Sequence, residues 1–475
     1  MTGEASKISY GDESPIAAFA TAPGNSALTL IRCSGKGVIE MFSQVFTPAG
    51  KKSSEGKAHL ENAGGNTVIH GWIVAANEKI DEVLVSLFRA PRSYTGEDSL
   101  DICCHGGSSA GKAVMAALKS AGFRDALPGE FTFRAFINGK LDLTRCESVM
   151  ELVSAKTDAG RRHAVSRLMG SIEKEINGIK SRLVQVLAGA EIFLDYSEDE
   201  IGADANEIAG ILPYKDIALE ALEQLKKLSA SWQLERIYQE GITLVIAGRP
   251  NAGKSSLFNL LLKEDRAIVT EMPGTTRDWI EAFVSIEGIP VRLVDTAGLR
   301  DASDSVEKIG VERSRKLLQE AEIVLYLIDG AYGLTNEDKE FICGLTCEAR
   351  LVAWSKCDIA LPPQPFPLND ISPLSVSAKT GEGLIELYKA IASAVLLQTA
   401  AEQGVSLGTK RQKTLVDSAC AALEEALAMA ESEGSELDLI APLLREAVSL
   451  LGEITGEVST ADILEEMFSR FCVGK

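Results

Sequence analysis

The spacing of hydrophobic residues changes along the chain and predicts its domains. In residues 1–127, short apolar runs such as Val83–Phe88 alternate with turns, which favours a small α/β domain. Residues 128–239 and 398–475 instead place apolar residues at helical intervals, as in 147–154. We therefore predict an N-terminal α/β domain and two helical segments separated by residues of a different pattern.

The separating segment opens with a phosphate-binding motif. Ile242–Ala247 is an apolar run suited to a buried strand, and Gly248–Ser255 then reads Gly-Arg-Pro-Asn-Ala-Gly-Lys-Ser, with Walker A spacing, before a helix start at 256–262. In this context backbone N–H groups and a helix N-terminus surround phosphates. We expect Lys254 to contact the β- and γ-phosphates and Ser255 to bind magnesium. The chain is therefore predicted to bind a nucleoside triphosphate.

Later loops, in the order found in guanine-specific hydrolases, indicate that the nucleotide is GTP. Thr276 offers a hydroxyl to magnesium and the γ-phosphate, and Asp295–Gly298 ends a strand with a carboxylate near the metal. Asp358 can accept hydrogen bonds from guanine N1 and its exocyclic amine, which adenine does not supply. Ser377–Lys379 offers a backbone N–H to guanine O6. The predicted GTP contacts are Asn251, Ala252, Gly253, Lys254, Ser255, Ser256, Thr270, Glu271, Met272, Pro273, Gly274, Thr275, Thr276, Asp295, Thr296, Ala297, Gly298, Ser355, Lys356, Asp358, Ser377, Ala378 and Lys379.

These loops define a domain of their own. A GTPase domain is complete in itself and its ends lie close together, so it can be inserted into another domain. We predict a Ras-like P-loop GTPase domain at residues 240–397, inserted into a helical-bundle domain that is split into 128–239 and 398–475. The predicted fold class is a multidomain combination of α/β and all-α parts.

Two positions depart from the usual pattern of small GTPases. Ser355 replaces the Asn that usually pins the base-specificity loop to the phosphate loop; we expect GTP specificity to persist through Asp358, with weaker affinity. Leu299 stands where Ras-like enzymes place the Gln that orients the attacking water. Hydrolysis then needs another water-positioning group. Glu307 is the best carboxylate candidate, and a solvated charge in the switch segment is the alternative.

Motifs outside the GTPase segment point to one family. They are Leu28–Gly35, Arg92–Asp98 and Pro128–Leu143, and the chain ends Phe468-Ser-Arg-Phe-Cys-Val-Gly-Lys475. Over almost its whole length the chain closely resembles the MnmE (also called TrmE) family of tRNA-modification GTPases. The family usually has Ile where this chain has Val473.

The resemblance implies an activity and partners. With an FAD-dependent partner (MnmG, or GidA), such proteins modify C5 of the wobble uridine of certain tRNAs with an aminomethyl or carboxymethylaminomethyl group. The one-carbon unit comes from a tetrahydrofolate derivative, 5-formyl or 5,10-methylene, and FAD enters only through the partner. A homodimer through the N-terminal domains and a heterotetramer with the partner are also implied. The N-terminal α/β domain would then bind the folate.

The resemblance also implies the folate contacts. By motif match these are Arg32, Glu97 and Lys140, with Lys475 reaching in from the C-terminus. A carboxylate such as Glu97 can pair with the amino-pyrimidine edge of the pterin, and cations suit the glutamate tail. Taken singly, each residue would be interpreted as part of a surface ion pair.

A potassium ion is implied as well. In similar cation-dependent GTPases it takes the place of an arginine finger, where charge builds as the γ-phosphoryl group leaves. Asn251 matches the side-chain ligand, and carbonyls near Thr270, Met272 and Thr275 would complete the shell. Arg277 is the alternative source of positive charge in cis.

Cys472 has two open roles. Its thiol could be a nucleophile towards a uracil ring or a one-carbon intermediate, since the nearby Lys475 favours the thiolate. A Cys after Phe471 is also an ordinary small apolar filler. The sequence therefore makes Cys472 a candidate catalytic residue with a structural alternative.

The composition of the chain indicates the cellular compartment in which the protein is expected. The 475 residues are 45% hydrophobic, and no apolar run reaches membrane-spanning length, so we expect a soluble protein without membrane association. The nine cysteines show no paired zinc-type spacing, and no secretory signal is evident at the start. A reducing cytoplasm is the expected location.

The charge of the chain bears on tRNA binding. A formal net charge of −20 opposes a grip on nucleic-acid phosphates. We interpret the basic clusters Arg161–Arg167 and Lys410–Lys413 as solvated helix faces. The partner protein is therefore expected to supply much of the tRNA affinity.

A second function class remains open: a ribosome-assembly or regulatory GTPase switch without covalent tRNA chemistry. Such a protein would normally carry an RNA-binding module, for example a KH domain with its Gly-X-X-Gly loop and basic face. The C-terminal segment is instead acidic and helical in pattern. Folate binding separates the two hypotheses.

Overall fold

A computed structural model gives the fold of two compact units, Met1–Cys146 with Gly452–Lys475, and Glu147–Leu451. Sheets and long helices are both present, which confirms the predicted multidomain combination of α/β and all-α parts. The structure describes residues 10–22, 24–50, 53–195, 215–264, 281–295, 321–345, 349–363, 366–368, 371–396, 404–431 and 437–474.

The first unit is built on a seven-stranded sheet with strand order β3-β4-β5-β6-β2-β1-β7. Its pairs are antiparallel except for β1 with β7. Along β5, Val83, Val85 and Leu87 are buried whereas Glu82 and Leu84 are exposed, so one face of the sheet carries the core. The strands are β1 Ile16–Phe19, β2 Leu28–Ser34, β3 Phe46–Pro48, β4 Thr67–Ala75, β5 Glu78–Phe88, β6 Ser99–His105 and β7 Arg124–Asp125.

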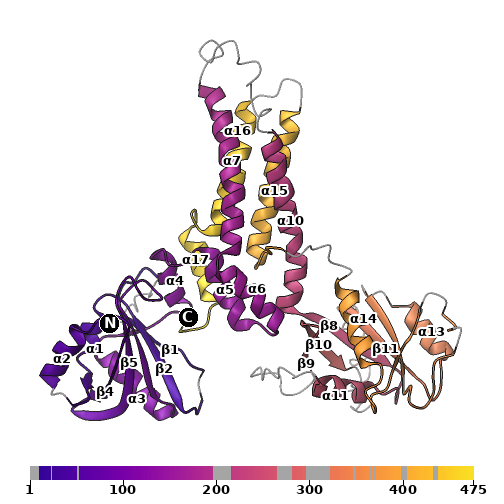
Figure 1. Cartoon of the computed structure of the whole chain (residues 1–475), viewed down its shortest axis with the longest axis horizontal. Helices are drawn as coiled ribbons and strands as arrows, with labels where there is room; N and C mark the ends of the chain where they lie inside the picture. Colours follow the sequence, from indigo (N-terminus) through magenta and orange to yellow (C-terminus); the bar gives the residue numbers. More distant parts are fainter. Residues whose placement is uncertain are drawn as a thin grey trace, which may run out of the picture. The chain divides into compact units, whose positions relative to one another are not determined.

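Three helices contribute to this core (Figure 1). Phe42, Leu60 and Leu118, one from each helix, are fully buried in one cluster with side chains of the strands. The helices are α1 Val38–Phe42, α2 Ser53–Glu61 and α3 Ser108–Ser120.

The C-terminal segment belongs to the first unit. Helix α17, Ala461–Ser469, packs against α4, Glu130–Ile137, with the rings of Phe468 and Phe133 5.4 Å apart. Gly129 has φ +67°, and a Cβ there would lie 2.7 Å from Cβ of Phe471. Only glycine combines that conformation with so close an approach. Segments that their spacing assigned to the helical domain thus join the sheet in one compact unit.

The second unit contains a bundle of long helices from both sides of the inserted segment. Helix α10 packs against α7 and α15 (Figure 1), and Gln239 Nε2 donates to the carbonyl oxygen of Gly408 at 2.7 Å. The two ends of the insertion are therefore held together, and the split bundle is confirmed. The helices are α5 Leu143–Ser154, α6 Asp158–Leu168, α7 Ser171–Asp195, α10 Lys215–Glu240, α15 Lys410–Ala430 and α16 Leu437–Thr455.

A buried ionic cluster joins α5, α6, α10 and the segment before α15. Arg167, only 2% exposed, donates to Glu151 and Glu235 at 2.6 Å each and to Ser406 at 3.2 Å. His163 Nδ1 lies 2.7 Å from the other oxygen of Glu235. Burial raises the pKa of Glu151 to about 8 against the attraction of Arg167. At Glu235 burial is outweighed by the hydrogen bonds with His163 and Arg167, which lower its pKa to about 2.

This cluster corrects the interpretation of Arg161–Arg167 as a solvated helix face. Arg161 and Arg162 are exposed and pair with Asp158, as that interpretation requires. Arg167 lies on the buried side of the same helix, where it donates to Glu151, 16 residues away, and to the carboxylate of Glu235, 68 residues away. The local sequence does not reveal such distant partners.

The inserted segment forms a six-stranded sheet with order β13-β12-β11-β8-β10-β9. Neighbouring strands are parallel except for β9 with β10. The strands are β8 Ile242–Gly248, β9 Glu281–Ile286, β10 Ile289–Asp295, β11 Ile323–Asp329, β12 Ala349–Ser355 and β13 Leu374–Val376, and the helices are α11 Lys254–Glu264, α13 Asn336–Cys343 and α14 Leu384–Leu396.

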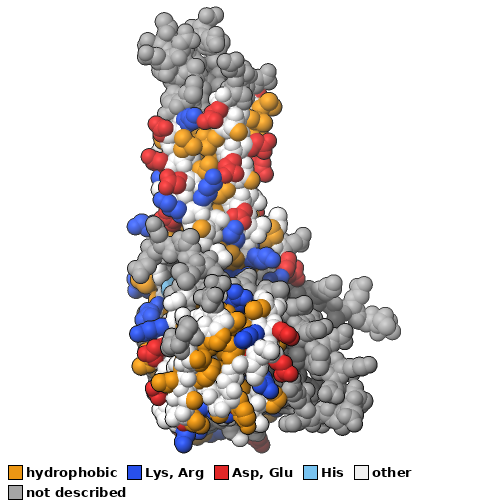
Figure 2. Space-filling view, turned by 90° about the vertical axis from the view of Figure 1, so that its right-hand side faces the viewer, with side chains coloured by type: hydrophobic (Ala, Val, Ile, Leu, Met, Phe, Trp, Pro, Cys, Tyr) orange, Lys and Arg blue, Asp and Glu red, His pale blue; other side chains and the backbone are white. Residues whose placement is uncertain are grey.

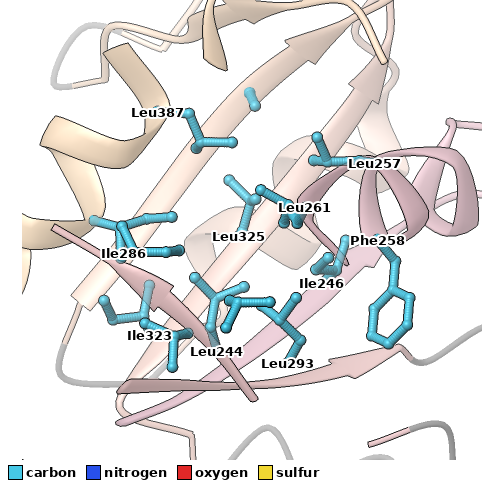
Figure 3. Close-up of a cluster of buried hydrophobic side chains, with 14 of the residues drawn as sticks. Leu244, Ile246, Leu257, Phe258, Leu261, Ile286, Leu293, Ile323, Leu325 and Leu387 are labelled. Carbon is cyan, nitrogen blue, oxygen red and sulfur yellow. The ribbon is translucent and has the colours of Figure 1, made fainter. Parts of the chain in front are cut away.

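Both faces of this sheet are covered, which explains why its central strands are almost continuously apolar. Leu257 of α11 and Leu387 of α14 pack with Leu325 on one face, as Figure 3 shows. Ile342 of α13 packs with Val324 on the other face. All seven residues of β11 are buried. The loops that follow the parallel strands therefore emerge from a rigid base.

The surface carries charges of both signs. On the face that Figure 2 shows, basic and acidic side chains are interspersed along the helices. Ion pairs between helices of the bundle include Lys226–Glu424 and Lys215–Glu431. In the described parts of the chain, no helix combines the length and apolar character needed to cross a membrane.

Candidate functional site

The phosphate loop lies between β8 and α11. Lys254, the first residue of α11, is 9% exposed, and its ammonium group donates to the carbonyl oxygens of Gly248 and Arg249 at 2.9 and 2.8 Å. The loop therefore folds around its own lysine. Together with the positive end of the α11 dipole, this arrangement suits an anion.

Left-handed backbone positions shape that loop. Asn251 and Gly253 have φ values of +64° and +91°, which re-aim successive N–H groups in a tight turn. A Cβ at Gly248 would lie 2.6 Å from the carbonyl oxygen of Leu327 on β11. Gly248 thus allows the start of the loop to lie against the neighbouring strand.

A pocket of about 330 Å³ connects the phosphate loop with the predicted base-specificity loops. Its residues come from α11 and from the ends of β11, β12 and β13, so separate segments of the sequence meet at one edge of the sheet. They are Gly253, Ser256, Leu257, Leu327, Ser355, Lys356, Asp358, Ile359, Val376, Ser377, Ala378 and Lys379.

The carboxylate of Asp358 is oriented within this pocket. Ser377, fully buried, donates its hydroxyl to Asp358 Oδ1 at 2.7 Å, while the Asp358 side chain itself is exposed. The N–H groups of Lys379 and Thr380 donate to the hydroxyl oxygen of Ser377 at 3.3 Å each. This chain of hydrogen bonds presents an acceptor suited to the guanine N1 and exocyclic amine donors.

Residues at the start of the same loop bond to β11. Ser355 donates its hydroxyl to the carbonyl oxygen of Ile328 at 3.0 Å. Lys356, with φ +56°, forms an ion pair with Asp329 at 2.6 Å. The base-specificity loop is therefore attached to the sheet by side chains that line or adjoin the pocket.

Three of the predicted folate contacts gather around the loop of residues 89–98 in the first unit. Arg32 pairs with Asp101 at 3.0 Å and lies 5.7 Å from the ring centre of Tyr94. Lys140 donates to the carbonyl oxygen of Pro91 at 3.0 Å. Each of these two cations has a partner within the protein. These contacts are compatible with folate binding and equally with the alternative that each residue is part of a surface ion pair.

Glu97 belongs to a more buried network. Arg134 Nη1 lies 3.0 Å and the Ser34 hydroxyl 2.8 Å from its carboxylate. Arg134 also donates to Glu130, which accepts two bonds from Arg124. Glu130 is fully buried and Arg134 is 5% exposed. The network therefore fixes the position of Glu97.

Comparison with known proteins gives the family. The family models described as "MnmE helical domain" and "GTP-binding protein TrmE N-terminus" match residues 143–472 and 15–140. The "tRNA modification GTPase MnmE" of Treponema denticola is 42% identical over 99% of both chains. Those of Carboxydothermus hydrogenoformans and Aquifex aeolicus are 38% and 39% identical, over 98% and 97% of this chain and 100% and 99% of theirs.

The chain belongs to the MnmE family of tRNA-modification GTPases. This confirms the resemblance and the predicted enzyme class, a GTP hydrolase in tRNA modification. The match of the helical-domain model runs from residue 143 to residue 472 and so includes the inserted segment.

Several predicted MnmE-type site residues lie outside the described residues. For Asp295 only the backbone is described, as the last residue of β10. The predictions for the switch segments and the C-terminal lysine thus remain predictions. The residues outside are Thr270, Glu271, Met272, Pro273, Gly274, Thr275, Thr276, Arg277, Thr296, Ala297, Gly298, Leu299, Glu307 and Lys475.

Cys472 is exposed, and its carbonyl oxygen accepts the N–H of Gly129 at 3.3 Å. An exposed thiol does not fill a core position, so the apolar-filler alternative is wrong. The catalytic hypothesis for this MnmE-family cysteine stays a prediction.

Arg134, Glu130 and Asp329 contact predicted site residues or their neighbours but were not predicted from the sequence. Glu130 and Arg134 are four residues apart on α4 within a motif that pointed to the MnmE family, and that spacing was their one available signal. Asp329 ends an apolar strand, and only its pairing with β12 brings it to Lys356.

Proposed function

We propose that this chain is a potassium-activated GTPase that works with an FAD-dependent partner of the MnmG (GidA) type. Together they use a one-carbon unit of a tetrahydrofolate derivative, 5-formyl or 5,10-methylene. The product is an aminomethyl or carboxymethylaminomethyl group at C5 of the wobble uridine of tRNA. The GTPase cycle would drive ordering of the switch segments.

The pocket between the phosphate loop and the Ser377–Asp358 hydrogen bond is the observation that carries the GTPase part of this proposal. One end adjoins the phosphate loop at Gly253, the neighbour of Lys254 in sequence, and the other offers a carboxylate to guanine. We assign magnesium to Ser255 and Thr276, because the Ser255 hydroxyl follows Lys254 in the first turn of α11.

For potassium the fit depends on Asn251. Its side chain is exposed and extends from a left-handed position of the phosphate loop, and the carbonyls of Thr270, Met272 and Thr275 would be its other ligands. When bound, the ion supplies positive charge where it develops on the phosphates. Glu307 would then orient water in place of a Gln, and Arg277 would stabilise the switch.

For the folate the fit depends on Glu97, Arg32 and Lys140, with Lys475 as a fourth contact. Glu97 offers acceptor oxygens held by Arg134, and the two cations gather around the same loop. This donor set suits a ligand with an amino-pyrimidine edge and a carboxylate tail. Cys472 is a candidate nucleophile for the transfer.

The proposed assembly is cytoplasmic: a homodimer that joins the flavoprotein in a heterotetramer. The net charge of −20 supports assigning most tRNA affinity to the flavoprotein.

The decisive experiment compares wobble-uridine modification in tRNA from cells with and without this gene. We expect the modified nucleoside to disappear, and unchanged tRNA would contradict the proposal.

A second experiment measures GTP hydrolysis in potassium and in sodium, with Asn251→Ala and, as the matched control, Asn259→Ala on the exposed side of α11. Equal rates in both salts would overturn the potassium assignment.

Folate binding tests the choice between the two function classes. We expect the chain to bind 5-formyltetrahydrofolate saturably and Glu97→Gln to weaken that binding by about tenfold, because a charge-assisted contact is lost. Glu78→Gln, at the exposed start of β5, is the matched control. Absence of binding by the dimeric wild-type chain would favour the regulatory-switch alternative.

A further inference from the structure

We infer that Asp329 is a positioning residue for guanine recognition, acting through its ion pair with Lys356 to hold the base-specificity loop. The inference rests on the proposed guanine-nucleotide site. The ion pair would secure a loop that has Ser355 in place of the usual Asn.

Ser355 does not provide the usual attachment. It is the last residue of β12, 7% exposed, and its hydroxyl donates to the carbonyl oxygen of Ile328 on the neighbouring strand. The Gly330 N–H donates to the Ser355 carbonyl oxygen at 3.0 Å. Ser355 thus attaches the strand end to β11, whereas an Asn in this place would attach the loop to the phosphate loop.

Lys356 makes the next attachment, with its ammonium group 2.6 Å from Asp329 Oδ2. Asp329 is buried, and its other carboxylate oxygen accepts the Ala331 N–H at 2.9 Å. The carboxylate is therefore fixed from two sides, and Lys356 supplies its positive partner. A charge-assisted contact in this partly desolvated place is stronger than an exposed ion pair.

The backbone conformation at Lys356 makes the position of the loop depend on the ion pair with Asp329. Lys356 has φ +56°, a left-handed conformation that is uncommon for residues other than glycine and is held in place by its surroundings. Asp358, whose carboxylate would read the base, lies two residues further on. A change at the Lys356 anchor therefore displaces the residue that reads guanine.

Lys356 itself lines the pocket, with a side chain 32% exposed, while Asp329 has 6% exposure and is not among the lining residues. The carboxylate thus acts on the base through Lys356. With the ion pair intact, the ammonium group of Lys356 is held at Asp329 while the residue lines the pocket.

The test uses full-length Asp329→Asn, which keeps the shape and removes the charge. We expect GDP affinity to fall by about 10- to 100-fold. Inosine diphosphate lacks the exocyclic amine from which Asp358 would accept a hydrogen bond. The preference for GDP over inosine diphosphate should therefore fall together with the GDP affinity. A purely structural role would lower the melting temperature without changing the ratio of the two affinities. Glu386→Gln, an exposed carboxylate on α14 of the same domain, is the control.

Two further variants keep the inference testable if Asp329→Asn folds poorly. Lys356→Met keeps an apolar stem and removes the ion pair, so it should reproduce the loss of selectivity, and the double variant should be no worse than either single one. Ser355→Asn should restore affinity in the Asp329→Asn background by returning the usual attachment.

The outcomes separate this inference from the proposed function. Wild-type protein that fails to bind GDP would refute the guanine-nucleotide site itself. The other outcome is that the wild type binds GDP and Asp329→Asn keeps its affinity and selectivity within about twofold of wild type, which is the ordinary scatter of such substitutions. That result would overturn this inference and leave the guanine-nucleotide site standing.

Discussion

Two charged clusters of the second unit show how burial distinguishes structural ion pairs from a binding site. In the helical bundle, Arg167 and Glu235 are almost completely buried and neutralise each other. In the nucleotide domain, Asp329 is buried but Lys356 lines an open pocket beside the exposed Asp358. The first cluster is closed and fixes a helix junction. The second is open on one side, so its charges can orient a ligand.

The difference has an energetic basis. A buried ion pair is costly to desolvate and becomes strongly destabilising when one partner is removed. A pair at a pocket is partly solvated, and its loss changes the pocket more than the fold. Substitutions in the two clusters should therefore affect different measurements.

The largest effect is expected for Arg167→Ala, which leaves Glu151 and Glu235 buried without their cation. We expect the helical bundle to lose about 3–5 kcal/mol of stability, measured by urea unfolding and by hydrogen exchange of α6 and α10. The folded fraction should keep its GDP affinity. Arg161→Ala on the same helix removes an exposed pair and should cost less than about 1 kcal/mol. Similar losses for both variants would refute the distinction.

At the phosphate loop, Lys254→Ala should weaken GDP binding by roughly 100-fold, because charge-assisted contacts with the phosphates are lost. A fluorescent GDP analogue gives the affinity, and thermal melting without nucleotide checks the fold. Lys263→Ala, at the exposed end of the same helix, is the matched control and should bind normally. A Lys254→Ala protein with wild-type affinity would remove this loop from the site.

Ser377→Ala should give a smaller loss, since it removes the hydroxyl that orients Asp358 without removing the carboxylate. We expect about a fivefold to tenfold weaker affinity for GDP, corresponding to one hydrogen bond. The partly buried Ser375 on β13 provides the control Ser375→Ala. Equal affinities of the two variants would show that Asp358 needs no orienting group.

The smallest effect concerns pH. Burial raises the pKa of Glu151 to about 8 from an ordinary value of 4.5. Because the folded state holds this proton more tightly, stability from the group is present below its unfolded pKa and is lost as the pH rises towards 8. Glu151→Gln removes that titration. The melting temperature of the variant relative to wild type should therefore rise by about 2–4 °C between pH 5 and pH 8, and a constant difference would contradict the assignment.

Much of the fold could be predicted because its signals are local. The apolar run before Gly248 and the helix start after Lys254 lie within a few residues of the motif they frame. Helical spacing on both sides of the insertion likewise indicated a bundle. The Lys254 loop and the pocket around Asp358 follow from parallel strands whose ends meet at one sheet edge.

The partners of charged residues could not be predicted in this way. Arg167 contacts Ser406, 239 residues away, and Arg134 reaches Glu97 from a helix 37 residues further along the chain. The sequence shows the same residue type whether a basic side chain lies on a solvated face or in a buried cluster. Its environment depends on which elements pack around it.

By itself the sequence determined the family, the nucleotide motif and the order of the domains, because these are written in contiguous residues with fixed spacing. Tertiary structure alone decided which charges are buried, which carboxylate each cation contacts, and that Asp329 rather than Ser355 holds Lys356. The physical reason is that desolvation and Coulomb attraction depend on distance in space. Distance along the chain does not fix either of them.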